Sequence, residues 1–310
     1  MAFALTDSWP MLKQTFAEWT EDKVPQLGAA LAFYTALSIS PLLVISLAVA
    51  AMVFGADAAR GEIQQQLGSL VGEEGGKAIQ QMIANANKPA EGTVATLLSV
   101  IILISGASGV FGQLQQSLNT IWEVEAKPGR GFIGMIRDRF LSAAMVFGVA
   151  FLLLVSLLLS AALTSLATVL NDLPDSLYWL TETMHFAISF AVITLLFAMM
   201  YKYLPDVKIA WRDVWLGAAV TAGLFTLGKF AIGLYLGHSS MASSYGVAGS
   251  FVVLLVRVYY SSQILFFGAE LTKVYANRYG SRIVPSENAE PLTKEARAKQ
   301  GRPKQFNAAG

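Results

Sequence analysis

The chain has 310 residues, of which 55% are hydrophobic and only 14% are charged, and its formal net charge is +1. Soluble domains carry about 25% charged residues, so this composition and a mean hydropathy of +0.53 exclude an ordinary soluble protein and predict a polytopic membrane protein. The absence of cysteine excludes disulfides, thiolate metal sites and a thiol nucleophile.

Residues 1–27 are predicted to form an amphipathic helix. Trp9, Leu12, Phe16 and Trp19 recur at helical spacing along this segment. Such a helix either lies in the membrane interface or packs as a soluble helix on the end of the bundle. The charged residues expected to face water are Lys13, Glu18, Glu21 and Asp22.

Apolar runs that follow are long enough to cross a bilayer, which takes about 20 residues. We predict an all-α fold, a polytopic six-transmembrane-helix bundle over residues 28–280. The predicted spans are 28–54, 94–118, 140–169, 182–203, 213–236 and 247–272. Residues 55–92 are polar but patterned, which predicts a helical hairpin between the first two spans, lying over one mouth of the bundle.

Basic residues are distributed unevenly among the segments between the spans. Residues 1–27, 119–139, 202–213 and 273–310 together hold seventeen of the 22 lysines and arginines. By the positive-inside rule, these segments and both termini are predicted to be cytoplasmic. Residues 281–310 have little to bury, which predicts a disordered basic cytoplasmic tail.

Two cations lie inside the last two apolar runs. Lys229 is predicted at roughly 10 Å and Arg257 at roughly 15 Å from the turn between these runs. An ionisable residue at such a depth is expensive and usually faces a bundle interior or a wet cavity. Glu270 comes thirteen residues after Arg257, roughly 20 Å further along the same helix.

We therefore expect Lys229 and Arg257 to bind an anion such as a phosphate or carboxylate headgroup, because arginine offers bidentate geometry. Three polar residues complete this predicted substrate-binding site: Tyr34 on the first span, and Tyr260 and Gln263 on the last. Two alternatives remain open. Lys229 snorkels to the headgroups, or Arg257 bonds to carbonyls freed by a kink at Pro41.

Other residues carry structural expectations. Gly109 belongs to a run of small residues that lets another helix approach closely, with a hinge as the alternative. Glu270 is expected to pair with Lys273, one helical turn further on, and a proton or coupling-ion role is secondary. His185 and His238 are interpreted as interfacial histidines rather than a metal pair.

Motifs for catalysis are not found in the chain, which lacks GxSxG, HExxH and a phosphate-binding glycine loop with Lys and Ser or Thr. We accordingly predict no catalytic residues, no metal, no cofactor and no nucleic-acid partner. The protein is not expected to be an enzyme.

Several blocks of the sequence resemble the YihY/BrkB inner-membrane family, once labelled as ribonucleases. These blocks are LGAALAFYTALSISPLLV, WRDVWLGAAVTAGLFTLGKFAIGLYL, SSYGVAGS and QILFFGAELTKVYA, within roughly residues 10 to 280. The resemblance implies a bacterial inner-membrane protein with six spans, a link to envelope integrity and, for some relatives, lipid export. It also implies family-pattern positions at Pro41, Lys229, Tyr245, Gly246, Gly268 and Glu270, whereas Arg257 departs from the pattern.

Two functions are compatible with these features. The first is a transporter or flippase-like protein for an anionic lipid or amphiphile, held between spans 1, 5 and 6. The second is a membrane scaffold that docks an envelope protein through the 55–92 hairpin. The sequence leaves the substrate, the direction of movement and the oligomeric state open.

Overall fold

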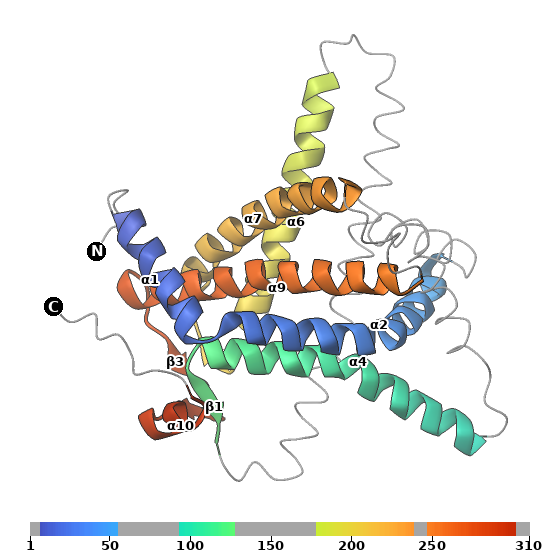
Figure 1. Ribbon diagram of the computed structural model, residues 1–310, viewed down its shortest axis with the longest axis horizontal. Coiled ribbons are helices and arrows are strands. Elements are labelled where there is room, and N and C mark those ends of the chain that lie inside the picture. The colour runs from blue at the N-terminus through green and yellow to red at the C-terminus, as the bar shows by residue number, and fades with distance from the viewer. Residues whose placement is uncertain (1–6, 55–92, 128–177, 239–246, 302–310) are drawn as a thin grey trace.

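A computed structural model of the protein describes residues 7–54, 93–127, 178–238 and 247–301 (Figure 1). This part of the chain is mostly helical, and its long helices coincide with predicted spans. They are α2 (Val24–Phe54), α4 (Thr93–Ile121), α6 (Tyr178–Tyr203), α7 (Trp211–His238) and α9 (Val247–Arg278). The predicted span 140–169 and the predicted hairpin 55–92 lie outside the described residues.

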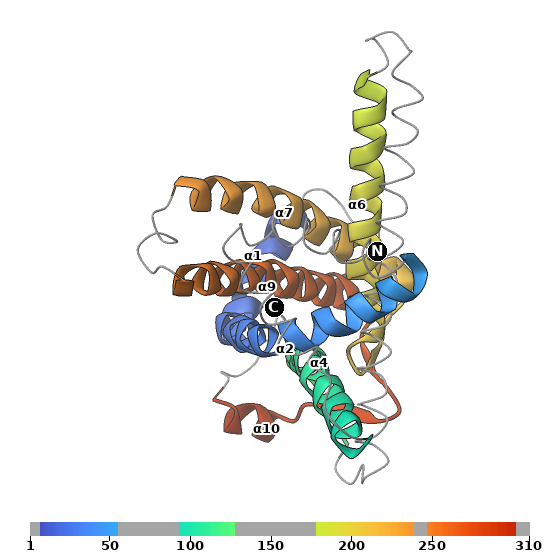
Figure 2. The ribbon, with the colours of Figure 1, turned by 90° about the vertical axis from the view of Figure 1, so that its right-hand side faces the viewer.

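Helix α9 is the centre of the described bundle. It lies between α7 and α2, and α4 packs on the other side of α2 (Figures 1 and 2). Helix α6 contacts α7 and crosses the other helices at a steep angle. Among the described helices, the segment Phe251–Arg278 of α9 is long and apolar enough to cross a membrane, with a mean hydropathy of 1.6.

Helices α7 and α9 approach closely through small residues. A Cβ atom on Gly217 would overlap the side chain of Thr272, and a Cβ atom on Gly268 would overlap that of Thr221. The two threonine hydroxyls donate to carbonyls of their own helices, Thr221 to Gly217 at 2.6 Å and Thr272 to Gly268 at 2.7 Å. This glycine and threonine pattern brings two backbones together without leaving a buried hydroxyl unsatisfied.

Helix α2 is helical from end to end but changes direction along its length (Figures 1 and 2). Pro41 lies near the middle of this 31-residue helix. A proline there removes one backbone hydrogen bond and bends the helix. The change of direction agrees with the kink that the sequence predicts at Pro41.

Helix α1 (Ser8–Glu21) forms within the predicted N-terminal segment and packs on α9. Most of its apolar stripe faces outward, since Trp9 is 72% exposed and Phe16 is 60% exposed, whereas Trp19 packs against the core. The expectation that Glu18 and Asp22 face water is wrong, because Asp22 is buried and both contact Lys273 on α9. The helix buries its polar face and exposes its aromatic one.

The C-terminal residues 281–301, which we call the C-terminal strap, run across one end of the bundle. Strand β3 (Val284–Pro285) pairs antiparallel with β2 (Val207–Lys208), and β4 (Ala289–Pro291) pairs antiparallel with β1 (Val124–Ala126). Helix α10 (Lys294–Lys299) follows β4. The expectation of a disordered tail is therefore wrong for residues 281–301.

The strap is ordered because the loops between the helices supply its partners. Asp213, fully buried at the start of α7, accepts hydrogen bonds from the Ser281 amide at 2.7 Å and its hydroxyl at 2.8 Å. Main-chain bonds continue along the strap, from the Ser286 amide to the Asp206 carbonyl and from the Leu292 amide to the Glu123 carbonyl. The low content of apolar residues predicts disorder for this segment, but hydrogen bonds and charged contacts hold the strap in place.

Candidate functional site: a mid-bundle cavity and a buried charge cluster

A cavity of about 430 Å³ opens between the five long helices. Its volume falls within the range of small-molecule sites. Apolar side chains from α2, α4, α6, α7 and α9 form most of the wall. The lining residues are Leu31, Thr35, Val110, Leu114, Phe197, Met200, Phe225, Gly228, Leu254, Arg257, Val258, Tyr260, Ser261, Ser262, Ile264 and Leu265.

Arg257 is the charged residue of that wall. Two of the hydroxyl groups on this wall are engaged within their own helices, since Thr35 donates to the Leu31 carbonyl at 2.8 Å and Ser262 donates to the Val258 carbonyl at 2.7 Å. The guanidinium is therefore the strongest feature for attracting a ligand on this wall. It would favour a negatively charged group attached to an apolar body.

The predicted substrate-binding residues divide into three groups. Arg257 and Tyr260 line the cavity. Tyr34 is exposed on α2, beside Gly109 of α4, and is not among the lining residues. The side chain of Lys229 lies outside the described residues, although the preceding Gly228 belongs to the wall.

Gln263 lies on the seam between α2 and α9 rather than on the cavity wall. A Cβ atom on Gly28 of α2 would overlap its carboxamide, so the side chain is pressed against the α2 backbone. Both polar atoms of this carboxamide are buried and find no hydrogen-bond partner among the described residues. Burial of an amide without hydrogen-bond partners costs free energy of folding, so the polar side chain of Gln263 stands out within an otherwise apolar seam.

The predicted structural positions are placed as follows. Gly109 faces α2, where an added Cβ would lie 3.3 Å from the Ser38 hydroxyl oxygen, and that hydroxyl donates to the Gly106 carbonyl at 2.6 Å. Gly268 lies at a junction of three helices, where Tyr201 of α6 donates to the Leu265 carbonyl of α9. Gly246 lies outside the described residues, as do the side chains of Pro41, His185 and His238.

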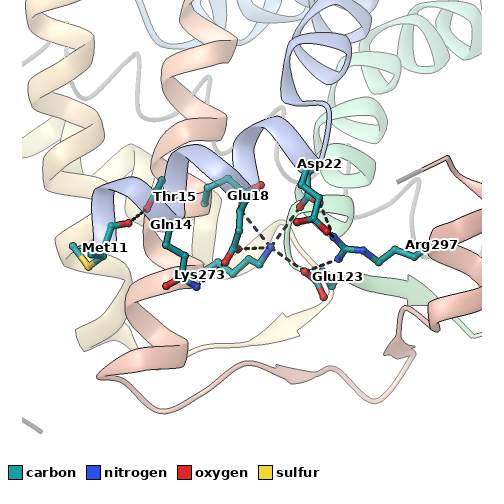
Figure 3. Close-up of polar contacts among 10 residues, drawn as sticks. Met11, Gln14, Thr15, Glu18, Asp22, Glu123, Lys273 and Arg297 are labelled. Atoms are coloured by element: carbon teal, nitrogen blue, oxygen red, sulfur yellow. Dashed lines mark hydrogen bonds and ion pairs between the residues drawn. The ribbon is translucent and has the colours of Figure 1, made fainter. Parts of the chain in front are cut away.

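A cluster of buried charges surrounds Lys273 near the end of α9 (Figure 3). Its ammonium nitrogen lies 2.8 Å from Glu18, 3.4 Å from Asp22, 3.1 Å from Glu123 and 3.3 Å from Glu270. The predicted contact of Glu270 with Lys273 is thus confirmed. The other three carboxylates come from the end of α1 and from the residues after α4.

A second cation joins the same cluster from the strap (Figure 3). Arg297 of α10 is buried and contacts Glu21 at 2.6 Å, Asp22 at 3.3 Å and Glu123 at 2.7 Å. We call the seven residues the charge hub. They are Glu18, Glu21, Asp22, Glu123, Glu270, Lys273 and Arg297.

The charge hub alters the titration of Glu123. Burial alone would raise the pKa of this carboxyl group, but the neighbouring Lys273 and Arg297 hold the pKa below its usual value. A carboxyl group with a lowered pKa stabilises the fold above its unfolded pKa, and that contribution is lost as the pH falls through the folded value. Acid should therefore loosen the strap.

This expectation can be checked with a spin label at Ala298→Cys, because the natural chain has no cysteine. Label mobility in the otherwise unchanged chain should rise as the pH falls below about 4.3, the usual pKa of glutamate. Glu123→Gln should raise the mobility at neutral pH and weaken its dependence on pH. Glu125→Gln, a change on the adjacent strand β1 and outside the hub, should leave the profile unchanged. An unchanged profile for Glu123→Gln would contradict the explanation.

Comparison with known proteins adds the family relationship. The model of the family described as virulence factor BrkB matches residues 15–293. A UPF0761 membrane protein of Verminephrobacter eiseniae is 27% identical over 85% of this chain and 62% of its own length. A UPF0761 membrane protein of Tolumonas auensis is 28% identical over 81% of this chain and 80% of its own.

A third relative, from Bacillus subtilis, is named putative ribonuclease-like protein YfkH and is 26% identical over 89% of this chain and 98% of its own length. Several of the UPF0761 proteins are longer, and this chain spans between half and about three fifths of their length. No solved structure matches the chain significantly. The described residues contain no group of three His, Asp or Glu side chains placed to hold a metal ion.

Proposed function

Because the chain belongs to the BrkB family of bacterial membrane proteins, we propose that it moves an anionic lipid or amphiphile across the inner membrane, in support of envelope integrity. The observation that carries this proposal is the cavity with its apolar wall and Arg257. A lipid has the matching chemistry, since its acyl chain suits the wall and its headgroup suits the guanidinium.

The proposal includes the membrane topology. Six spans with both termini in the cytoplasm are supported by the positive-inside rule, and the described basic residues Lys208, Lys273 and Arg297 lie with the hub and the strap. Exposed apolar side chains on the long helices support contact with lipid: Phe33, Leu37, Phe186 and Leu227. Exposed aromatic residues near the strap end, Trp211 and Trp215, are typical of a membrane interface.

A reconstitution experiment tests the proposal. The protein is placed in liposomes with a fluorescent anionic phospholipid, and movement between leaflets is followed by quenching of the outer leaflet. A hydrogen bond to a charged group contributes about 1.5–3 kcal/mol, so Arg257→Gln should slow the movement at least about tenfold. The matched control is Arg212→Gln, whose side chain is 78% exposed at the start of α7.

The headgroup supplies the second comparison. Movement of a zwitterionic lipid should be slower than that of the anionic lipid, and it should respond less to Arg257→Gln. Equal rates for the parent protein, Arg257→Gln and protein-free liposomes would overturn the proposal. That result would favour the scaffold function.

A further inference from the structure

Glu270 is the least compensated carboxyl group of the charge hub. Its side chain is fully buried, one oxygen lies 3.3 Å from the Lys273 nitrogen, and the other finds no hydrogen-bond donor among the described residues. By contrast, Glu18 receives a hydrogen bond from Gln14 at 2.8 Å, and Asp22 and Glu123 also contact Arg297.

The number of charges in the hub points to a bound proton. Five carboxyl groups share two cations, and an ammonium group has three donors for the four carboxyl groups around it. Excess negative charge in a buried cluster is costly, and uptake of a proton removes it. A proton on the Glu270 oxygen that lacks a donor would remove one of these negative charges.

The position of Glu270 connects this proton to the cavity. Helix α9 supplies Arg257 and Tyr260 to the cavity wall and Glu270 to the hub. Gln263 lies seven residues before Glu270, on the same face of the helix and about 10 Å away along its axis. Its buried, unsatisfied carboxamide is a polar group between the two sites.

We propose that Glu270 is a proton-binding site that couples movement of the anionic ligand to the proton gradient. The proton comes from water at the cytoplasmic end and binds the Glu270 oxygen that lacks a donor. Its gain or loss changes the charge that faces Glu18, Asp22, Glu123, Lys273 and Arg297, and α9 transmits the change to the cavity. The coupling to ligand movement rests on the proposed function, whereas proton binding at Glu270 does not.

Infrared difference spectroscopy tests proton binding without any ligand. The purified full-length protein in lipid nanodiscs should show the carbonyl band of a protonated carboxylic acid near neutral pH, where exposed glutamates are ionised. Glu270→Gln should lose this band, and Glu270→Asp should retain a shifted one. Glu287→Gln, a change at a highly exposed carboxylate, should leave it unchanged. Persistence of the band in Glu270→Gln would overturn the assignment.

Transport under an imposed pH gradient tests the coupling. The gradient should alter the rate of anionic lipid movement by the parent protein, and Glu270→Gln should lose this response while it still equilibrates the lipid without a gradient. An unchanged response in Glu270→Gln would overturn the coupling. If no variant moves lipid, the proposed function and the coupling both fail, and the infrared band still decides whether Glu270 binds the proton.

Discussion

Lys273→Met should lower the free energy of unfolding by about 3–5 kcal/mol, because removal of one partner from a buried ionic cluster leaves the remaining charges uncompensated. Lys273 is the residue that holds α1, the residues after α4 and α9 together, through contacts with Glu18, Glu123 and Glu270. The loss should appear as a lower thermal unfolding midpoint in detergent and as a smaller monodisperse fraction.

Lys208→Met is the matched control for this change. Lys208 also pairs with a glutamate across elements, at 3.1 Å from Glu287, but the two side chains are 62% and 86% exposed. Exposed pairs contribute about 0–1 kcal/mol, so this variant should unfold close to the parent temperature. Equal midpoints for the two variants would show that burial of the hub contributes nothing to stability.

Gly268→Ala should also destabilise the protein, by about 1–3 kcal/mol, because overpacking a close helix contact forces the backbones apart. The added Cβ would overlap the Thr221 side chain and lie 2.6 Å from the Tyr201 hydroxyl oxygen. Both neighbours are fully buried, so the helices must move rather than a flexible side chain. Thermal unfolding in detergent measures the loss.

Two further variants separate this contact from helix propensity. Gly112→Ala is also a glycine replacement within a helix, but nothing lies within 4 Å of its added Cβ. Alanine is favoured over glycine in a helix interior by about 1 kcal/mol, so this variant should gain stability. Adding Thr221→Ala to Gly268→Ala should recover part of the lost stability. If it recovers none, the overlap with Thr221 is not the cause of the destabilisation.

The long helices could be predicted from the sequence because a long apolar helix is encoded locally. An uninterrupted apolar run sets the position of α7 or α9 without knowledge of any distant residue. The placement of Arg257 on a cavity wall was predicted for a similar reason, since a charge within such a run has few favourable surroundings. The sequence does not show which face of each helix lines the cavity. For this reason Gln263 is predicted on the cavity wall, whereas it lies on the seam between α2 and α9.

The charge hub could not be predicted because its contacts connect distant parts of the chain. Arg297 meets Asp22 across 275 positions, and Lys273 meets Asp22 across 251. From the sequence alone, a glutamate at the end of an apolar run is predicted to face water, and a basic tail is predicted to be disordered. The one hub contact that the sequence predicts, Glu270 with Lys273, is also the one between residues a helical turn apart.

The strap has a consequence for biosynthesis. Translation proceeds from the N-terminus, and chains begin to fold as they emerge, so α1 and the long helices are synthesised before residues 281–301 leave the ribosome. Until then β1 and β2 have no partner strands, and Glu21 and Asp22 await the guanidinium of Arg297. The strap therefore completes this end of the bundle after the helices have been synthesised, and a chain that stops at Arg278 would lack the partners of both strands and of these two carboxylates.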